Sequence, residues 1–324
     1  MSAGALESEI AAHNEDPSDL PPSQKAVAGR TPLQLAWARL RKDKAALFCA
    51  VVIVVLVLLA LFAPLITKAL GQGPYAPDLD PQHGGLSIDG LPGHPSVHHL
   101  LGTDDEGRDV LARLLYGART SLFIGLAATV LQIVVGTVAG LLAGFYRGSV
   151  DLVLSRFMDI LLAFPVIIVG LALVSRLGAH TWVTLLIIAG FGWSSLARIV
   201  RGQVLALRER EFVEAAKSLG ASDARIMFVD ILPNLLAPII VYGTLLIPVN
   251  IVFESTLSFL GLGVQPPNAS WGQMLGAASG VYQQAWWFLV FPAVALLITT
   301  LSFNILGDGL RDALDPRYDR TVAK

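Results

Sequence analysis

The chain has 324 residues, of which 54% are hydrophobic and 15% are charged, and its formal net charge is −2. A soluble domain carries about 25% charged residues, and the deficit here falls in long charge-free runs. The nearly neutral charge excludes the strongly basic field of a nucleic-acid-binding protein. A single cysteine, Cys49, excludes a disulfide within the chain.

The N-terminal region has two parts. Residues 1–30 are acidic, contain several prolines and have few large apolar side chains, which predicts a disordered tail. Residues 31–67 combine an amphipathic stretch of Leu, Trp, Arg and Lys with the first charge-free run. The amphipathic stretch is typical of a helix on a membrane surface. Because no cleavable signal precedes the charge-free run, we expect it to stay in the membrane as an anchor.

Six segments are long and apolar enough to cross a bilayer as helices, given a rise of about 1.5 Å per residue and a hydrocarbon core about 30 Å thick. They are Ala45–Thr67, Thr120–Tyr146, Asp151–Ser175, Leu177–Ala197, Ile231–Phe253 and Ala285–Gly307. The chain is therefore predicted to be an all-α membrane protein with six transmembrane helices. Residues 119–308 form its predicted core, with the first span as a peripheral addition.

Lysine and arginine residues near the span ends predict the orientation. They concentrate before the first span, between spans four and five, and in the tail of residues 309–324. The positive-inside rule then places both termini in the cytoplasm. Residues 68–118 become an extracytoplasmic loop, which we expect to end in a short helix, Asp109–Tyr116.

The second external segment, residues 255–284, contains no Asp, Glu, Lys, Arg or His. A solvated loop normally carries charges, so one interpretation is that this segment dips into the membrane interface or plugs a cavity. The other interpretation is an ordinary hairpin on the outer surface. Irregular backbone at membrane depth is tolerated only against protein or water, and the two interpretations stay open.

Polar side chains within the spans are candidates for a transport pathway or a gate. They are Gln132, Asn250, Glu254 and Asn304. Glu254 either meets a substrate amino group or anchors the segment that follows it, and its place at a span end favours the anchoring role. Asp159 is predicted to form a structural ion pair with Arg156, three residues before it.

Three glycines at a spacing of four, Gly136, Gly140 and Gly144, lie on one face of the second predicted span. Glycine lets another helix approach closely. We therefore predict a helix-packing face here and not a pore lining.

The sequence contains none of the catalytic or nucleotide-binding motifs that would indicate an enzyme. It contains no H-E-x-x-H, no G-x-S-x-G and no Gly-x4-Gly-Lys-Ser/Thr phosphate-binding loop. Four histidines share the first loop, and imidazole suits nickel, copper and zinc. They are His83, His94, His98 and His99. The surrounding glycines and prolines give no helix to fix their spacing, so we predict no metal site.

Residues 203–232 predict two cytoplasmic helices joined at a tight corner. Five small or apolar residues recur near helical spacing: Leu205, Phe212, Ala215, Ala216 and Leu219. Gly220 suits a left-handed position that ends the first helix. Ser222 can cap the second helix, and Asp223 favours its N-terminal dipole. Composition alone leaves open a solvated hairpin or a projection that inserts into a partner.

The pattern E214-A-A-x3-G220-x10-I-L-P233 closely resembles the cytoplasmic EAA loop of ABC importer permeases, whose short coupling helix docks on an ATPase subunit. Residues 101–122, 254–275 and 306–317 resemble, in the same order, signatures of the dipeptide, oligopeptide and nickel branch. The resemblance covers nearly all of the chain after residue 30. The polar N-terminal tail and the His-rich stretch of residues 82–99 depart from it.

The resemblance implies the type I ABC importer permease fold in a bacterial inner membrane. It also implies a second related permease, two ATPase subunits or domains that carry ATP and Mg²⁺, and an extracytoplasmic solute-binding protein. This chain would carry no cofactor, contact membrane lipid and bind no nucleic acid. The transported solute would be a di- or oligopeptide or a related small solute.

The loop pattern and the predicted corner together assign ATPase docking to one set of residues: Glu214, Ala215, Ala216, Gly220, Ser222 and Asp223. The alternative function is that of a stand-alone secondary transporter. Such a protein needs buried ion-coupling carboxylates near the middle of the membrane. Only Asp159 and Glu254 come near that position, and both are close to span ends.

Overall fold

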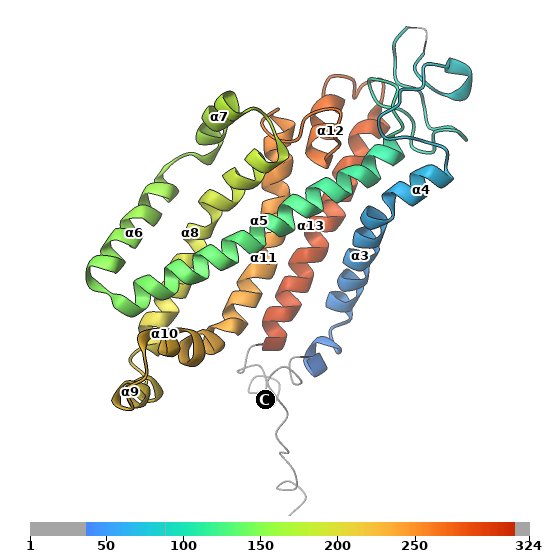
Figure 1. Ribbon diagram of the computed structural model, residues 1–324. Coiled ribbons are helices and arrows are strands. Elements are labelled where there is room, and N and C mark those ends of the chain that lie inside the picture. The colour runs from blue at the N-terminus through green and yellow to red at the C-terminus, as the bar shows by residue number, and fades with distance from the viewer. Residues whose placement is uncertain (1–36, 88, 315–324) are drawn as a thin grey trace, which may run out of the picture.

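The computed structural model describes residues 37–87 and 89–314, and helices dominate that part of the chain (Figure 1). Five single helical runs are long and apolar enough to cross a membrane, and a bent pair of helices makes a sixth if it counts as one span. The single runs are α3 (Lys44–Leu61), α5 (Val110–Tyr146), α8 (Thr181–Leu207), Asp223–Phe259, which contains α11 (Leu232–Phe259), and α13 (Trp286–Leu314). The prediction of an all-α membrane protein is confirmed. The predicted disordered tail lies outside the described residues.

The third predicted span, Asp151–Ser175, is wrong as a single helix. It consists of α6 (Gly148–Ala163) and α7 (Val166–Leu177), which are bent by 85° relative to each other. The break falls at Phe164, whose backbone is extended, and Pro165. Proline has no N–H for the helical ladder and disfavours helical backbone in the residue before it. Nothing in this segment restores the helix across the break.

The predicted short helix Asp109–Tyr116 is also wrong as a separate element. It forms the first turns of the 37-residue helix α5, which runs without interruption past residue 119. The carboxylate of Asp109 accepts a hydrogen bond from the N–H of Ala112 at 2.7 Å and caps the helix. The N-terminal turns of α5 therefore belong to the segment that was predicted to be the first loop.

The first span also differs from its prediction at the outer end. Helix α3 ends at Leu61, and α4 (Ala63–Ala69) follows with Pro64 in its first turn. Proline is favourable at the start of a helix, where its missing N–H costs no hydrogen bond. The apolar run therefore makes two helices instead of one.

The close contact between α5 and α8 forms the centre of the bundle. Gly136, Gly140 and Gly144 all face α8. A Cβ atom added at Gly140 would lie 2.6 Å from the carbonyl oxygen of Ala197 and 2.7 Å from the Cβ of Val200. Only glycine permits this backbone approach.

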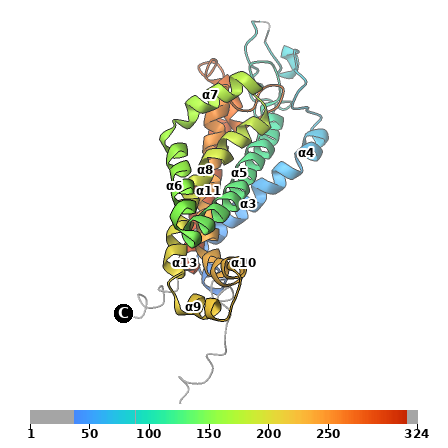
Figure 2. The same cartoon turned by 60° about the vertical axis from the view of Figure 1, so that its left-hand side comes forward.

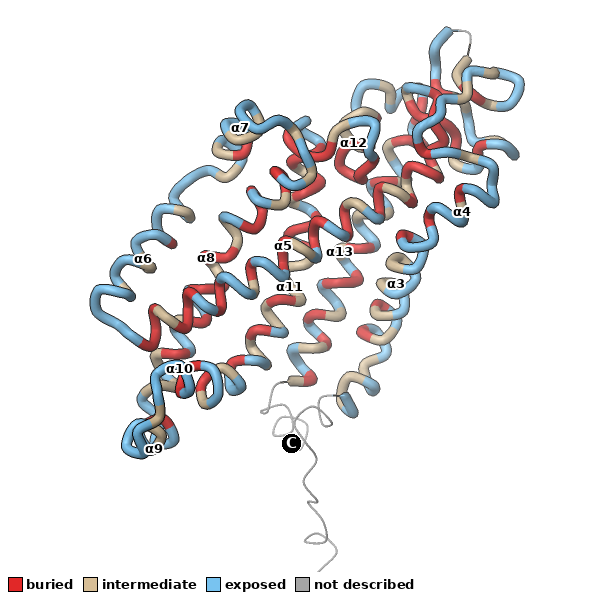
Figure 3. The backbone as a smooth tube through the Cα atoms, in the orientation of Figure 1, coloured by how far each residue is buried: buried red, intermediate tan, exposed pale blue. Residues whose placement is uncertain are grey.

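Burial concentrates along α5, α8, α11 and α13, as Figure 3 shows. By contrast, α6 and α7 are mostly exposed and bury only Met158 and Gly170. Helix α3 packs along α13: a Cβ atom at Gly309 would lie 2.6 Å from the Cβ of Ala46, and Arg39 donates a hydrogen bond to the carbonyl of Ala313 at 3.3 Å. The start of α3 and the end of α13 thus share one end of the bundle.

The charge-free segment after α11 packs on the bundle at the opposite end. It contains α12 (Trp271–Ala278), which contacts α11, α13 and α5. Leu262, Val264 and Met274 are buried in it. An unpaired charge would be costly at the buried positions of this segment, whereas residues 266–268 and 282–284 are exposed.

The glycine face gives a stability prediction. Replacing Gly140 with valine is expected to destabilise the folded chain by about 1–3 kcal/mol, because the added side chain overpacks the contact with α8. Thermal unfolding in detergent measures the loss. The control is Gly202→Val, since a Cβ atom at Gly202 meets nothing within 4 Å. Equal stability of the two variants would show that the close approach of α5 and α8 is wrong.

Candidate functional site

A helical corner projects from one end of the bundle, opposite the first loop (Figure 1 and Figure 2). The corner comprises α9 (Glu211–Ser218), α10 (Asp223–Arg225) and the π-helical segment η2 (Ile226–Ile231). It leaves the bundle at the end of α8 and returns to it through α11. In both views α9 lies beyond the ends of the neighbouring helices.

The turn of the corner has the predicted local structure. Gly220 has a φ of +76°, and the N–H of Ala221 donates to the carbonyl of Ala216 at 3.0 Å. This is the Schellman pattern that ends a helix at a left-handed glycine. The hydroxyl of Ser222 accepts a hydrogen bond from the N–H of Arg225 at 3.4 Å and caps α10. The corner is therefore a defined turn between two helices.

The predicted docking residues differ in exposure. Glu214, Ala215, Gly220, Ser222 and Asp223 are exposed, whereas Ala216 is half-buried against the bundle.

Sequence reasoning did not select Phe212 and Leu219 for docking, yet their exposed fractions are 42% and 88%. Phe212, Ala215 and Leu219 form a stripe at positions i, i+3 and i+7. This spacing indicates that the three residues share one face of a helix. The sequence does not show whether that face meets solvent or the bundle.

One hydrophobic cluster fixes the corner to the bundle. Val213 of α9 is fully buried and packs with Phe145 of α5, Val204 of α8, and Ile226 and Ile231 of η2. The same cluster continues into α11. The corner is thus attached through one apolar contact region to the C-terminal ends of α5 and α8 and to the N-terminal end of α11.

Polar contacts add to this attachment at the C-terminal end of α5. The guanidinium of Arg208 lies over the ring of Phe145 and donates a hydrogen bond to its carbonyl. The ammonium of Lys217 lies 5.8 Å from the same ring centroid. Arg147 and Glu209 form an ion pair at 2.5 Å. These contacts link α9 and the end of α8 directly to α5.

Two ion pairs tie α6 to α8. Asp151 pairs with Arg201 at 2.5 Å, and Asp159 pairs with Arg198. The predicted contact of Asp159 with Arg156 is present at 3.5 Å, so this carboxylate has two cationic partners. The exposed helix α6 therefore depends on charges as well as packing for its position.

The structure brings together two of the four intramembrane candidates. The amides of Gln132 and Asn250 bond to each other at 3.0 and 3.1 Å. Asn250 also donates to the hydroxyl of Thr129 at 2.8 Å, and Gln132 donates to the carbonyl of Ile188 at 2.9 Å. Gly192 faces the Gln132 amide and leaves room for it. This amide network joins α5, α8 and α11 inside the bundle.

A cavity of about 230 Å³ adjoins the amide network. Gln132 and Asn250 line it together with Phe164 at the break between α6 and α7. Asn304 lies elsewhere: it is exposed on α13 and lines a separate hollow with Thr300 and Thr256. The four candidates therefore do not form one polar path within this chain.

Glu254 is fully buried inside α11 and not at its end. Ser258 donates to its carboxylate at 2.7 Å, and the hydroxyls of Ser121 and Ser270 also face it. The hydroxyl of Ser258 accepts a hydrogen bond from the N–H of Val264 at 3.0 Å. The carboxylate therefore joins α11, α5 and the charge-free segment.

The N-terminal end of α5 contains a buried ion cluster that sequence reasoning had not singled out residue by residue. Asp104 accepts from Arg108 at 2.7 Å and contacts the Nε of Arg113 at 3.1 Å, and all three side chains are buried. Arg113 also donates to Gln273 of α12 at 2.8 Å. The cluster connects the first loop, α5 and the charge-free segment. The sequence feature that could have indicated this cluster is the Asp-Asp-Glu-Gly-Arg-Asp run before α5.

Two acidic residues of the first loop have shifted pKa values. The N–H of Asp80 and the neighbouring His99 hold the pKa of Asp78 below its usual value. Asp78 therefore stabilises the loop at neutral pH and loses this effect as the pH falls through its lowered pKa. Burial and the nearby Asp104 raise the pKa of Asp105.

The loop histidines have separate neighbours. His99 is buried between Asp109, at 2.9 Å, and Asp78, at 3.2 Å. His94 lies against Trp287 with the two rings tilted by 49°, and His83 lies beside His98 with ring centroids 5.2 Å apart. Among residues 37–87 and 89–314, no group of three or more His, Cys, Asp or Glu side chains is placed to hold a metal ion.

The ion cluster gives a second stability prediction. Arg113→Met is expected to cost about 3–5 kcal/mol, because it breaks a buried ion pair and leaves Gln273 without its donor. Arg176→Met serves as the control, since Arg176 is exposed. Thermal unfolding in detergent measures both variants. A double variant with Asp104→Asn should lose less than the sum of the two single losses, and strict additivity would contradict the pairing.

Comparisons with known proteins identify the family. Residues 136–320 match the family described as the binding-protein-dependent transport system inner membrane component. Residues 31–86 match the N-terminal transmembrane domain of oligopeptide transport permease C.

Several relatives align over most of the chain. The dipeptide transport system permease protein DppC of Alkalihalophilus pseudofirmus is 41% identical over 92% of this chain and 94% of its own length. The di/tripeptide permease DppC of Pseudomonas aeruginosa is 38% identical, with 92% and 96% covered. The glutathione permease GsiD of Escherichia coli is 40% identical, with 89% and 91% covered.

In this family, ATP is hydrolysed by a separate subunit and the permease has no catalytic role. The resemblance found in the sequence is confirmed, and the alternative of a stand-alone secondary transporter is set aside. The chain belongs to the family of inner-membrane permease components of binding-protein-dependent transport systems, in the peptide branch of the ABC importers.

Proposed function

We propose that this chain and a second related permease together form the translocation path for di- or oligopeptides. The main observation in support of this function is the similarity of about nine-tenths of the chain to permeases named for dipeptides, di/tripeptides and glutathione. All three names denote short peptides. An extracytoplasmic binding protein delivers the solute, and two ATPase subunits or domains supply the energy.

We also propose that the projecting corner is the docking surface for an ATPase subunit. Its exposed residues Glu214, Ala215 and Gly220 match the family's loop pattern, and the exposed Ser222 and Asp223 begin the second helix of the corner. Phe212 and Leu219 extend this surface with exposed apolar side chains. An apolar stripe rimmed by charges suits insertion into a cleft of a partner.

The distribution of cations supports a cytoplasmic position for the corner and for both termini. Arg198, Arg201, Arg208, Lys217 and Arg225 belong to the corner or to the adjoining part of α8. The start of α3, with its own cluster of Lys and Arg, lies beside the end of α13. At the opposite end, two of the arginines are neutralised in the buried ion cluster. The positive-inside rule then orients the bundle.

The hydrophobic cluster around Val213 provides a route from the corner to the spans. A force on α9 acts on the inner ends of α5 and α8 through Phe145 and Val204, and on α11 through η2. π-Helical segments often occur at functional sites within longer helices. ATP-driven movement of the docked subunit would therefore shift several spans together and alternate access to the path.

Glu254 and the amide network take supporting roles in this proposal. The buried Glu254 carboxylate has serine hydroxyl partners and is not open to a substrate amino group. Gln132 and Asn250 satisfy each other inside the bundle, where an unpaired amide would be costly. Gln132 and Asn250 also line the cavity beside the α6–α7 break. In this proposal, only the part of each side chain that faces this cavity is available to a transport pathway.

The docking surface is tested by purifying the wild-type chain with its partners from detergent-solubilised membranes. The wild type is expected to retain an ATPase subunit, a second permease and a binding protein. Glu214→Arg should lose the ATPase and keep the second permease, because it reverses a charge on the exposed corner. ATPase release is measured by quantitative mass spectrometry of the purified complex.

The matched control is Asp89→Arg, a charge reversal at an exposed position of the first loop. It should retain every partner. Retention of the ATPase by Glu214→Arg and by Leu219→Asp would reject the corner as the docking surface. If Glu214→Arg and Leu219→Asp both fold normally but lose every partner, the contacts of the corner would not be specific to the ATPase subunit.

The solute is tested by uptake into proteoliposomes that contain the whole transporter and its binding protein. Labelled dialanine should accumulate only with ATP, and unlabelled short peptides should compete with it. Accumulation of nickel or another solute without peptide competition would retain the permease assignment and reject peptides as the solute.

A further inference from the structure

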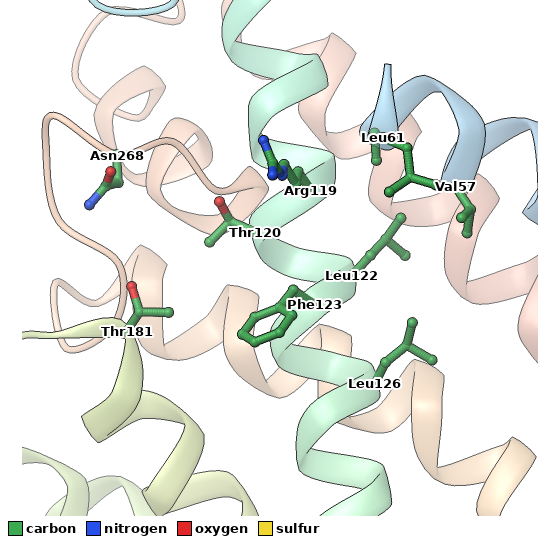
Figure 4. Close-up of a pocket in the computed structure, with 10 residues that line it drawn as sticks. Val57, Leu61, Arg119, Thr120, Leu122, Phe123, Leu126, Thr181 and Asn268 are labelled. Carbon is green, nitrogen blue, oxygen red and sulfur yellow. The ribbon is translucent and has the colours of Figure 1, made fainter. Parts of the chain in front are cut away.

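A groove of about 530 Å³ crosses the exposed face of α5 near its outer end (Figure 4). Helix α3 forms one wall through Val57 and Leu61, and Thr181 and Asn268 lie on the other side. Its floor is α5 from Arg119 to Leu126. The function proposed above uses no part of this groove.

The groove has a polar end and an apolar end. Arg119 and Thr120 stand toward the outer end of α5, and Phe123 and Leu126 follow further along the same helix (Figure 4). Phe123 is 60% exposed and Leu61 of the facing wall is 62% exposed. These side chains are open to whatever occupies the groove within the membrane.

The depth of Arg119 in the membrane follows from the sequence of α5. The charge-free run between Arg119 and Arg147 has 27 residues, and as a helix it is about 40 Å long. The hydrocarbon core is about 30 Å thick. Arg119 therefore lies at the level of the lipid headgroups, and the apolar part of the groove lies at the level of the acyl chains.

The side chain of Arg119 is exposed at the polar end of the groove. Within residues 37–87 and 89–314, no ion pair involves its guanidinium. The neighbouring groove residues Thr120, Thr181 and Asn268 add hydroxyl and amide groups and no carboxylate. Arginine binds phosphate through charge-assisted hydrogen bonds. The missing partner is thus a phosphate at the headgroup level.

We propose that this groove binds a glycerophospholipid of the outer leaflet, with its phosphate on Arg119 and an acyl chain along Phe123 and Leu126. A phospholipid has the required order of groups along the membrane normal: an anionic head outside and an apolar chain inside. A wholly apolar helix of the second permease would cover the apolar part but leave the Arg119 charge unpaired, whereas the lipid phosphate pairs with it.

The bound lipid would fill the space between α3 and the core and fix the peripheral helix on α5. Helix α3 is mostly exposed and buries only three of its residues within this chain. The bound lipid would therefore hold α3 in its position against α5. This role does not depend on which solute is transported.

Native mass spectrometry of the complete transporter tests the site with two lipids that share the same chains. Dioleoyl phosphatidylglycerol is expected to bind the wild type, and dioleoylglycerol, which has no phosphate, is expected to bind at the background level. Arg119→Gln should weaken phosphatidylglycerol binding about fivefold, which corresponds to ~1 kcal/mol for one basic side chain at an anionic headgroup. Leu126→Trp should also weaken it by filling the apolar end.

Arg176→Gln is the control, because Arg176 is an exposed arginine outside the groove, at the end of α7. It should bind phosphatidylglycerol like the wild type. Equal binding by wild type and Arg119→Gln would overturn the proposal. So would photochemical capture of the second permease by a benzophenone maleimide attached to Phe123→Cys in a Cys49→Ala background, since the groove would then be a contact between subunits.

Discussion

The close approach of α5 to α8 is the contact on which the rest of the bundle depends. Three glycines leave no side chain between the helices, and carbonyl oxygens of α8 lie where Cβ atoms would otherwise stand. In lipid, helices gain little from the hydrophobic effect, so close packing of small residues contributes much of their association. Phe145 directly follows the last of these glycines. The contact therefore places Phe145 against the end of α8, where the corner begins.

The two ends of the bundle are stabilised in different ways. At the corner end, cations remain exposed and pair at the surface or lie over Phe145. At the outer end, Asp104, Arg108 and Arg113 are buried and fix the first loop and α12 to α5. Between them, the polar side chains of the bundle core satisfy one another, as Gln132 and Asn250 do. This arrangement keeps unpaired polar groups out of the hydrocarbon, where they are most costly.

Most of the architecture could be predicted from the sequence. Charge-free runs, flanking cations and glycine spacing each reflect a constraint that acts within one segment of the chain. Gly220 and Ser222 were predictable for the same reason, since a left-handed turn and a helix cap depend on nearby residues only. The break at Pro165 was missed because proline is often tolerated within membrane helices, and tolerance depends on neighbours that the sequence does not name. The continuity of α5 was missed because charged residues near Arg119 suggested a boundary.

The candidate site was less predictable than the fold. The docking pattern identified the corner, but only the structure separates Ala216, which faces the bundle, from Phe212 and Leu219, which face outward. Glu254 looked like a span-end charge, and its burial depends on serines from α5 and from the charge-free segment. Asn304 could not be separated from Gln132 and Asn250 by sequence, because their distance depends on how α13 packs. These assignments all depend on contacts between segments far apart in the chain.

In the proposed mechanism, the corner and the C-terminal ends of α5 and α8 move as one unit. This joint movement is tested most directly by pulsed electron paramagnetic resonance on the complete transporter, in a Cys49→Ala background. One spin-label pair lies within the unit, at Leu219→Cys and Tyr146→Cys, and a second pair joins Leu219→Cys to Arg311→Cys on α13. Between the nucleotide-free and vanadate-trapped states, the first distance should stay constant and the second should change. A change in the first distance with a constant second distance would show that the corner swings independently and would contradict the account.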